Sequence, residues 1–351
     1  MFLHKSTIAL LFGIFVMSAQ VQVQAQTASL ADGRSGRIEF NSVTPRSRWD
    51  YLRSVTQQMK PVVVYGDLLL PKAVQAGTRV PAVVMSPGSF GVESNAFDVW
   101  AKELNAAGMA VFVVDSFKPR GVDEVGSQQD KVDYSANVAD ALNALKLLAT
   151  HPAIDASKIY HIGFSRGGGV AFDTAWPMWQ EPANIGSLRF AKHVAFYPGN
   201  CNVKYRSDKV ERATAPILAL YADRELEEAQ SVETCIRWND QLIAEGAPIT
   251  YREYRGARHG FDGLNFTYRV VPNQQSGTKC NVDVTIPLRQ GAGLGKAVDN
   301  RNNTTATTFP EFTAMTNACA SWQNASRGGG NARGIQAESV RDTLAFLQGS
   351  K

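Results

Sequence analysis

Short apolar runs alternate with amphipathic segments along most of this 351-residue chain. Residues 109–115, MAVFVVD, are apolar almost throughout, which is typical of a strand covered on both faces of a sheet. The segment before it, residues 97–108, places its apolar side chains on one helical face and ends at a glycine. Because this alternation continues toward the C-terminus, we expect an α/β fold: a mostly parallel central sheet with helices on both faces.

The same patterns predict the other elements of this fold. Strands are expected at residues 62–71, 80–88, 158–164, 192–199, 215–223 and 249–256, and helices at residues 136–151, from 167 onward, at 229–246 and at 337–348. Residues 26–48 are polar and are expected to be irregular.

The N-terminus is typical of a secretory signal peptide. Lys5 precedes the apolar run Ile8–Met17, and Val23-Gln24-Ala25 fits a small-residue cleavage site. The run is too short to span a bilayer, and no later stretch is long and apolar enough to do so. Residues 1–25 are therefore predicted to direct export to the periplasm or the medium, leaving residues 26–351 as a single domain without a membrane span.

The charge of the chain suggests no polyanionic partner. The formal net charge is +4 at pH 7, and there are no runs of lysine or arginine. Nothing in this balance favours a nucleic-acid partner or an acidic membrane surface.

Four cysteines lie after the signal peptide, and an even number in an exported protein favours disulfides. A zinc site is the alternative, but no two cysteines are close in sequence and no histidine pair has ligand spacing. Of the possible pairings we expect Cys201–Cys235 and Cys280–Cys319, because each closes a loop of moderate length. No metal is expected.

Residues 263–334 interrupt the alternation of strands and helices. They are rich in Asn, Thr, Gly and Gln, and so long an irregular stretch inside a domain is usually functional or disordered. Because Cys280 and Cys319 both fall within it, we expect an ordered, disulfide-stapled insertion before the last helix.

Residues 163–167 read GFSRG and match the pattern G-x-S-x-G, with a predicted strand before and a predicted helix after. This pattern makes a sharp turn that lifts a serine hydroxyl clear of the sheet. A phosphate-binding loop is disfavoured because neither G-x-x-x-x-G-K-[ST] nor G-x-G-x-x-G is present. The remaining alternative is a plain structural turn. The context favours Ser165 as a nucleophile.

A serine nucleophile needs a base, and His259 is the best-placed histidine. It follows a predicted strand in the turn GARHGFDG. It also comes after Ser165, as it does where a G-x-S-x-G serine, an acid and a histidine follow one another along the chain. The acid that orients the histidine should follow the strand between them. That strand is followed by Asp223, Glu225, Glu227 and Glu228. Spacing alone does not choose among these carboxylates.

An oxyanion hole needs two backbone N–H groups. One is expected from Arg166, directly after the nucleophile, and the other from the loop at residues 86–91, at Ser89 or Phe90. An ordinary Pro-Gly turn is the alternative for that loop. Arg120, in a loop after a strand, is a candidate for binding a substrate carboxylate or else a plain surface arginine.

Several segments together resemble the dienelactone hydrolase family of α/β hydrolases: YGDLLLPK, VVDSFKPRG, IYHIGFSRGGG, APILALYADRE and YRGARHGFD. The resemblance covers about residues 60–262 and the last helix. It implies the nucleophile at Ser165, the histidine at His259 and the acid at Glu225, with Asp223 in reserve.

The chain departs from the family pattern in three places. Cysteine is the nucleophile in the enzymes that name the family, so Ser165 leaves the substrate open. Pro87-Gly88 replaces a frequent His-Gly, and Glu225 replaces an aspartate. The insertion has no counterpart in the family, and because it follows His259 directly we expect it to wall the substrate pocket.

The expected function is therefore that of an exported serine hydrolase, which cleaves a small carboxylic ester or lactone through an acyl-enzyme and needs no cofactor. The same three side chains also serve peptidases and acyltransferases, and the fold hosts non-catalytic binding proteins. The sequence does not indicate an oligomeric state.

Overall fold

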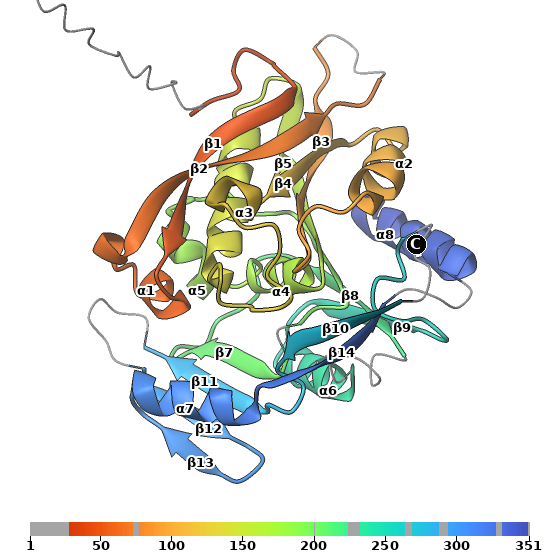
Figure 1. The fold of residues 1–351 in the computed structure, drawn as a ribbon. Helices are drawn as coiled ribbons and strands as arrows, with labels where there is room; N and C mark the ends of the chain where they lie inside the picture. Colours follow the sequence, from red (N-terminus) through yellow and green to blue (C-terminus); the bar gives the residue numbers. More distant parts are fainter. Residues whose placement is uncertain are drawn as a thin grey trace, which may run out of the picture.

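The computed structural model describes residues 28–72, 77–199, 201–223, 232–263, 269–287, 294–327 and 332–349 (Figure 1). The predicted signal peptide and Glu225 lie outside these residues. No helix in the described ranges is long and apolar enough to cross a membrane.

The core is an eight-stranded sheet in the order β1-β2-β4-β3-β5-β6-β8-β9. Its strands are β1 (Gly36–Pro45), β2 (Met59–Leu69), β3 (Val80–Ser86), β4 (Ala110–Asp115), β5 (Ile154–Phe164), β6 (His193–Phe196), β8 (Ile217–Ala222) and β9 (Ile249–Tyr254). β1 pairs with β2, and β2 with β4, in antiparallel fashion; all other neighbours are parallel. The predicted mostly parallel sheet is confirmed.

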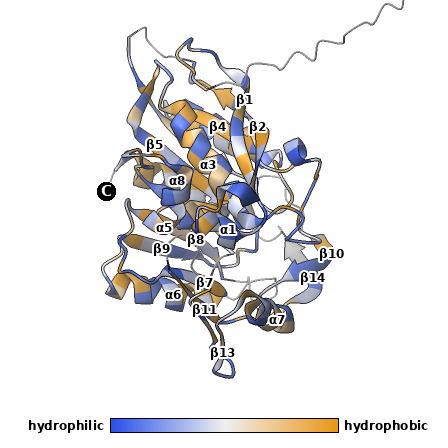
Figure 2. Cartoon of the chain, turned by 90° about the vertical axis from the view of Figure 1, so that its left-hand side faces the viewer, coloured by the Kyte–Doolittle hydropathy of each residue, from blue (hydrophilic) through white to orange (hydrophobic). Residues whose placement is uncertain are grey.

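Helices cover both faces of this sheet (Figure 1). They include α1 (Arg48–Leu52), α2 (Lys102–Ala106), α3 (Tyr134–Leu148), α4 (Arg166–Asp173), α5 (Pro177–Gln180), α6 (Val232–Ala244) and α8 (Ala332–Gln348). The segment Ala96–Ala101, which leads into α2, is a π-helix. The helices carry both hydrophobic and hydrophilic residues, as expected of elements with one face on a sheet (Figure 2).

The buried strands alternate their side chains between two apolar layers. In β4, Phe112 packs into the layer that contains Leu142 of α3. The next residue, Val113, packs into the opposite layer with Trp100. Because successive side chains of a strand point to opposite faces, a strand that is apolar throughout must be covered on both sides, as the sequence predicted.

The prediction that residues 26–48 are irregular is wrong, because this segment contains β1. Ile38 and Phe40 are buried at alternate positions, and the Phe40 ring lies 5.7 Å from that of Phe112. The polar residues between them hid this short alternation. An antiparallel edge strand with one solvated face needs only a few apolar side chains.

The described parts of the insertion fold into strands and a helix. Its elements are β10 (Arg269–Ser276), β11 (Val282–Ile286), β12 (Lys296–Asp299), β13 (Thr304–Ala306), α7 (Phe309–Cys319) and β14 (Ser321–Arg327). β10 and β14 form a two-stranded antiparallel ribbon, and β11 pairs in parallel with β7 (Val203–Ser207) in a sheet of order β13-β12-β11-β7. Val282, Val284 and Ile286 are buried in the same apolar cluster as Phe112 and Leu142 of the α/β domain.

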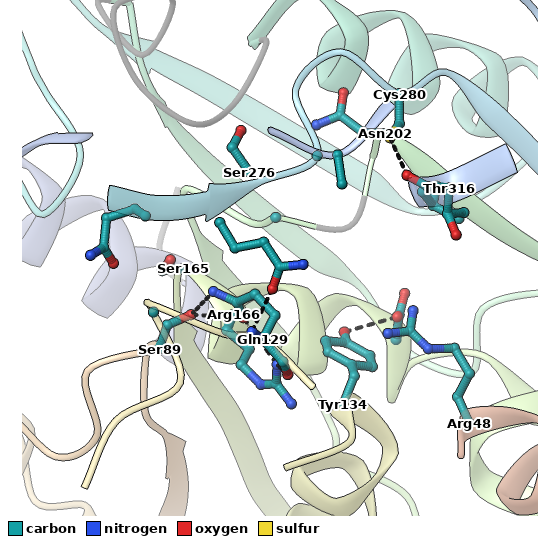
Figure 3. A pocket seen from close by; sticks show the side chains of 18 of the residues that line it. Arg48, Ser89, Gln129, Tyr134, Ser165, Arg166, Asn202, Ser276, Cys280 and Thr316 are labelled. Carbon is teal, nitrogen blue, oxygen red and sulfur yellow. Dashed lines mark hydrogen bonds between the residues drawn. The ribbon is translucent and has the colours of Figure 1, made fainter. Parts of the chain in front are cut away.

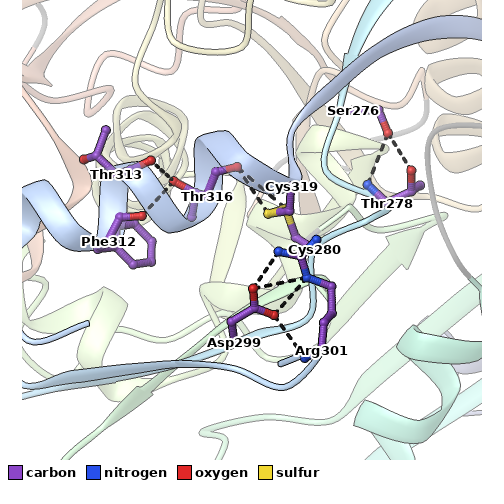
Figure 4. The surroundings of a disulfide bond; sticks show 9 residues. All are labelled: Ser276, Thr278, Cys280, Asp299, Arg301, Phe312, Thr313, Thr316 and Cys319. Carbon is purple, nitrogen blue, oxygen red and sulfur yellow. Dashed lines mark hydrogen bonds and ion pairs between the residues drawn. A yellow bond between two sulfur atoms is a disulfide. The ribbon is translucent and has the colours of Figure 1, made fainter. Parts of the chain in front are cut away.

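Both expected disulfides are confirmed: Cys201–Cys235 and Cys280–Cys319. The second joins the turn after β10 to the last residue of α7, just before β14 begins, and so closes the base of the ribbon (Figure 4). The Thr308 side chain and Glu311 form a reciprocal capping box at the start of α7.

Candidate active site

Ser165 lies at the turn between β5 and α4, in a backbone conformation that side chains rarely adopt. Its φ is 55° and its ψ is −114°. Strain of this kind costs about 1–3 kcal/mol and persists where the surrounding structure enforces it. Here two glycines allow the close packing of the turn. A Cβ at Gly163 would lie 1.8 Å from the carbonyl oxygen of Gly167, and a Cβ at Gly167 would lie 2.2 Å from that of Ser86.

His259 lies in the loop that follows β9 and lines the same cavity as Ser165. Its imidazole packs against the tilted ring of Tyr197, with the ring centroids 4.5 Å and the planes 53° apart. Tyr197 directly follows β6 and also has a positive φ, 36°. The two residues predicted as nucleophile and base, far apart in sequence, therefore line one cavity at the carboxyl ends of β5 and β9, which β6 and β8 separate in the sheet.

The acid of the predicted triad is not placed by the structure. Glu225 lies outside the described residues. Asp223 directly follows β8, and its carboxylate accepts a hydrogen bond from the backbone N–H of Gly256 at 2.8 Å. This bond anchors the start of the loop that carries His259. The choice between Glu225 and Asp223 stays a prediction.

The residues expected to form the oxyanion hole are close to the nucleophile. Arg166 is the first residue of α4, where a backbone N–H has no partner within the helix. Ser89 and Phe90 line the cavity together with Ser165. Gly88 approaches so closely that a Cβ on it would lie 3.5 Å from the Cβ of Ser165.

The cavity beside Ser165 and His259 has a volume of about 390 Å³ (Figure 3). One wall comes from the α/β domain and includes Tyr134 and Arg48. The opposite wall comes from the insertion and includes residues 274–277, Cys280 and Thr316. The expectation that the insertion walls a pocket is confirmed.

The side chain of Arg166 is an unforeseen feature of this cavity. It is buried, and its guanidinium donates to neutral acceptors: Asn137 Oδ1, the Val132 carbonyl, and both the carbonyl and Oε1 of Gln129. Burial lowers the pKa of Arg166 to about 10. At the far end of the cavity, Arg48 donates a hydrogen bond of 2.8 Å to the hydroxyl of Tyr205. No motif marks either side chain in the sequence.

Arg120 is engaged elsewhere and is not among the residues that line the cavity. Its guanidinium pairs with Asp140 of α3 at 2.8 and 2.9 Å, and both side chains are buried. It also donates to Thr44 Oγ1 and to the Val43 carbonyl of β1. Arg120 therefore ties the edge strand to α3, and the structure gives no support to a contact with a substrate carboxylate.

Asp262, three residues beyond His259, is a buried carboxylate that the sequence did not single out. It is fully buried and accepts hydrogen bonds from Tyr197 Oη, from Trp100 Nε1 at 2.8 Å and from Asn95 Nδ2 at 2.5 Å. Burial raises its pKa above the ordinary value, although these hydrogen bonds act in the opposite direction.

Within the described ranges, no group of three His, Cys, Asp or Glu side chains is placed to hold a metal ion.

A mostly parallel sheet with a serine on a strained turn between strand and helix is the architecture of the α/β hydrolases. The chain belongs to the dienelactone hydrolase family, whose model matches residues 66–270, more than half of its length. It is thus a member of a hydrolase family.

Solved structures with partial similarity include two hydrolases. One is a thermophilic esterase from the Planctomycetes species Thermogutta terrifontis with propionate bound; it is 20% identical, with 58% of this chain and 82% of that chain covered and a TM-score of 0.46. The other is a dienelactone hydrolase-like promiscuous phosphotriesterase from metagenomic libraries; it is 18% identical, with 65% and 85% covered and a TM-score of 0.42. No curated protein matches the chain. The family assignment rests on the family match.

Proposed function

We propose that this protein is an exported serine hydrolase that cleaves a carboxylic ester or a lactone. The observation that carries the proposal is that Ser165, on its strained turn, lines one cavity of about 390 Å³ together with His259. A serine hydroxyl held clear of a sheet, in the same cavity as an imidazole, is suited to attack a carbonyl carbon.

In the proposed reaction His259 removes the proton from Ser165 Oγ as that oxygen attacks the substrate carbonyl. The backbone N–H groups of Arg166 and Ser89 stabilise the resulting oxyanion, and one such donor typically contributes about 10²–10³ in kcat. Glu225, or Asp223 in its place, orients the imidazole and stabilises its charged form. The imidazolium then protonates the leaving alcohol, and His259 later activates water to release the acyl group.

The position of His259 indicates where the alcohol part of the substrate lies. The departing oxygen must accept a proton from this imidazole, and His259 lines the large cavity. The alcohol part would therefore lie in that cavity, against the wall that the insertion provides. This arrangement also accounts for an insertion placed directly after the histidine loop.

Export is part of the proposal and rests on two features. Residues 1–25 have the pattern of a signal peptide, and two disulfides are present. Disulfides persist mainly in oxidising compartments, which is consistent with the periplasm or the medium.

The test is Ser165→Ala with a short nitrophenyl ester as substrate and a fluorophosphonate probe as label. The wild-type protein should hydrolyse the ester and label at Ser165, and the variant should lose at least about 1,000-fold in kcat and fail to label. Unchanged hydrolysis in the variant would refute the mechanism. A wild-type protein that folds but never labels would instead favour a binding protein, and faster cleavage of amides than of matched esters would favour a peptidase.

A further inference from the structure

The ribbon of β10 and β14 is bonded to a loop of the α/β domain at residues 124–129. The Gln275 N–H donates to the Gly126 carbonyl at 3.1 Å, and the Gln275 side-chain oxygen accepts from the Gln129 N–H at 2.7 Å. Trp322 Nε1 donates to the Ser127 carbonyl at 3.3 Å. Three hydrogen bonds, two from β10 and one from β14, therefore hold this loop against the insertion.

The ribbon and the Phe90 ring both approach the loop closely at Gly126. A Cβ at Gly126 would lie 2.4 Å from the side-chain oxygen of Gln274 and 3.0 Å from the ring of Phe90. The loop thus packs between the insertion on one side and the expected oxyanion loop on the other. A shift of the ribbon would be transmitted to Gln129.

Gln129 connects this loop to both of the residues assigned to the oxyanion hole (Figure 3). Its side-chain oxygen and nitrogen lie 3.2 and 3.1 Å from Ser89 Oγ. Its side-chain oxygen and its carbonyl each accept from Arg166 Nη1 at 3.0 Å. A second link joins the two loops, because the Val125 N–H donates to the Ser89 carbonyl at 2.7 Å.

These contacts matter because the oxyanion donors act only at short range. Such donors must lie about 2.7–3.1 Å from the developing charge, so a small displacement of either backbone N–H removes much of the stabilisation. Arg166 and Ser89 are largely buried, and both side chains bond to the Gln129 amide; Arg166 also donates to Asn137, Val132 and the Gln129 carbonyl. Loss of the Gln129 amide would leave buried polar groups unpaired and drive both segments to rearrange.

We propose that Gln129 is a positioning residue that sets the Ser89 loop and the first turn of α4 relative to Ser165, and that the insertion acts on catalysis through it. The inference rests on the proposed hydrolase function. Gln129 need not touch the reacting atoms. Its role is to hold two backbone donors at one distance from the nucleophile.

The experiment compares two substitutions at one position with a neighbouring control. Gln129→Met keeps the length of the side chain and removes its hydrogen bonds, whereas Gln129→Glu keeps an acceptor for Arg166 and for the hydroxyl of Ser89. Gln128 is exposed, so Gln128→Met is the matched control. The readouts are kcat and KM for a short nitrophenyl ester, the rate of fluorophosphonate labelling and the thermal midpoint.

Gln129→Met should lower kcat and the labelling rate about 10–100-fold, within the range set by one oxyanion donor, with KM changed less than about three-fold. Gln129→Glu should restore most of the loss, and Gln128→Met should behave as wild type. If Gln129→Met does not fold, Ser89→Ala breaks the same link from the other side and keeps the backbone N–H. It should lower kcat several-fold with KM unchanged.

Three results would overturn the inference: kcat of folded Gln129→Met or of Ser89→Ala within two-fold of wild type, Gln129→Glu as impaired as Gln129→Met, or a rise in KM with kcat unchanged. If the wild-type protein neither cleaves esters nor labels, the proposed hydrolase function fails and the inference about Gln129 fails with it. If the wild type is active and one of the three results above is found, only the inference about Gln129 fails.

Discussion

The ring of Tyr197 packs against the imidazole of His259, with the ring centroids 4.5 Å apart. The hydroxyl of Tyr197 donates to the buried carboxylate of Asp262, only three residues beyond His259 in the chain. Asp262 also accepts from Trp100 and Asn95, which belong to the segment before α2. A buried carboxyl group therefore holds the tyrosine ring against which the proposed base packs.

Asp262→Asn should both destabilise the protein and slow ester cleavage. An asparagine presents an N–H₂ group where three donors converge, so one buried donor loses its acceptor, at a cost of about 1–3 kcal/mol. Tyr197 would then shift beneath His259 and lower kcat. Urea unfolding and steady-state kinetics measure the two effects. Asp130→Asn, at an exposed position, should change neither, and a stable, fully active D262N protein would contradict the interpretation.

The same variant predicts a pH dependence. Burial raises the pKa of Asp262 above 3.8, its value in the unfolded chain. At pH values between 3.8 and the raised pKa of the folded state, the folded protein binds this proton more tightly than the unfolded chain does. The free energy of unfolding of the wild type therefore falls as pH rises through this range. Asparagine does not titrate. The stability gap between wild type and Asp262→Asn should therefore narrow as pH rises from about 3.8, and a gap that widens would reverse the sign.

Glu211 should also make the free energy of unfolding fall as pH rises. Burial raises the pKa of this carboxyl from 4.5 to about 7. Its favourable contribution is complete below pH 4.5 and is lost as pH rises through about 7. Glu211→Gln should thus stabilise the protein above pH 7 by about 1–2 kcal/mol, allowing for partial exposure. Unfolding at pH 5 and pH 8 tests this, with Glu233→Gln, an exposed glutamate, as the control.

Arg120→Met should weaken the fold and leave substrate affinity unchanged. It strips a buried partner from Asp140, and breaking such a pair costs about 3–5 kcal/mol. Arg37→Met removes an exposed pair with Asp67 and should cost less than about 1 kcal/mol. KM for esters with and without a substrate carboxylate decides between a structural and a binding role. A selective rise in KM for the acidic ester would restore Arg120 as a substrate contact.

Loss of the Cys280–Cys319 disulfide should loosen the wall of the cavity. The bridge spans 39 residues and closes the base of the β10–β14 ribbon. A double Cys→Ala variant should lose about 4 kcal/mol, the loop-entropy value for a bridge of that span. It should also have a lower kcat, because the ribbon holds the 124–129 loop. Unchanged stability and kinetics would show that the insertion does not depend on its staple.

Much of the fold could be read from the sequence because its signals are local. A run such as residues 109–115 can only be covered on both faces, and glycines around Ser165 permit a turn that a Cβ would block. The edge strand at Gly36–Pro45 was not predicted because it has few apolar side chains. The insertion seemed irregular because its short strands are embedded in polar residues.

By itself, the sequence determined the α/β alternation, the turn at Ser165 and the later place of His259, whereas it only favoured the disulfide pairing that the structure has. Each follows from neighbouring residues or from chain order. Only the tertiary structure decided that Arg120 pairs with Asp140, that Asp262 bonds to Tyr197, and that Gln129 joins the insertion to the loop of Ser89. These are contacts between side chains far apart in the chain. Their partners depend on how strands, loops and insertion pack together, which no local pattern specifies.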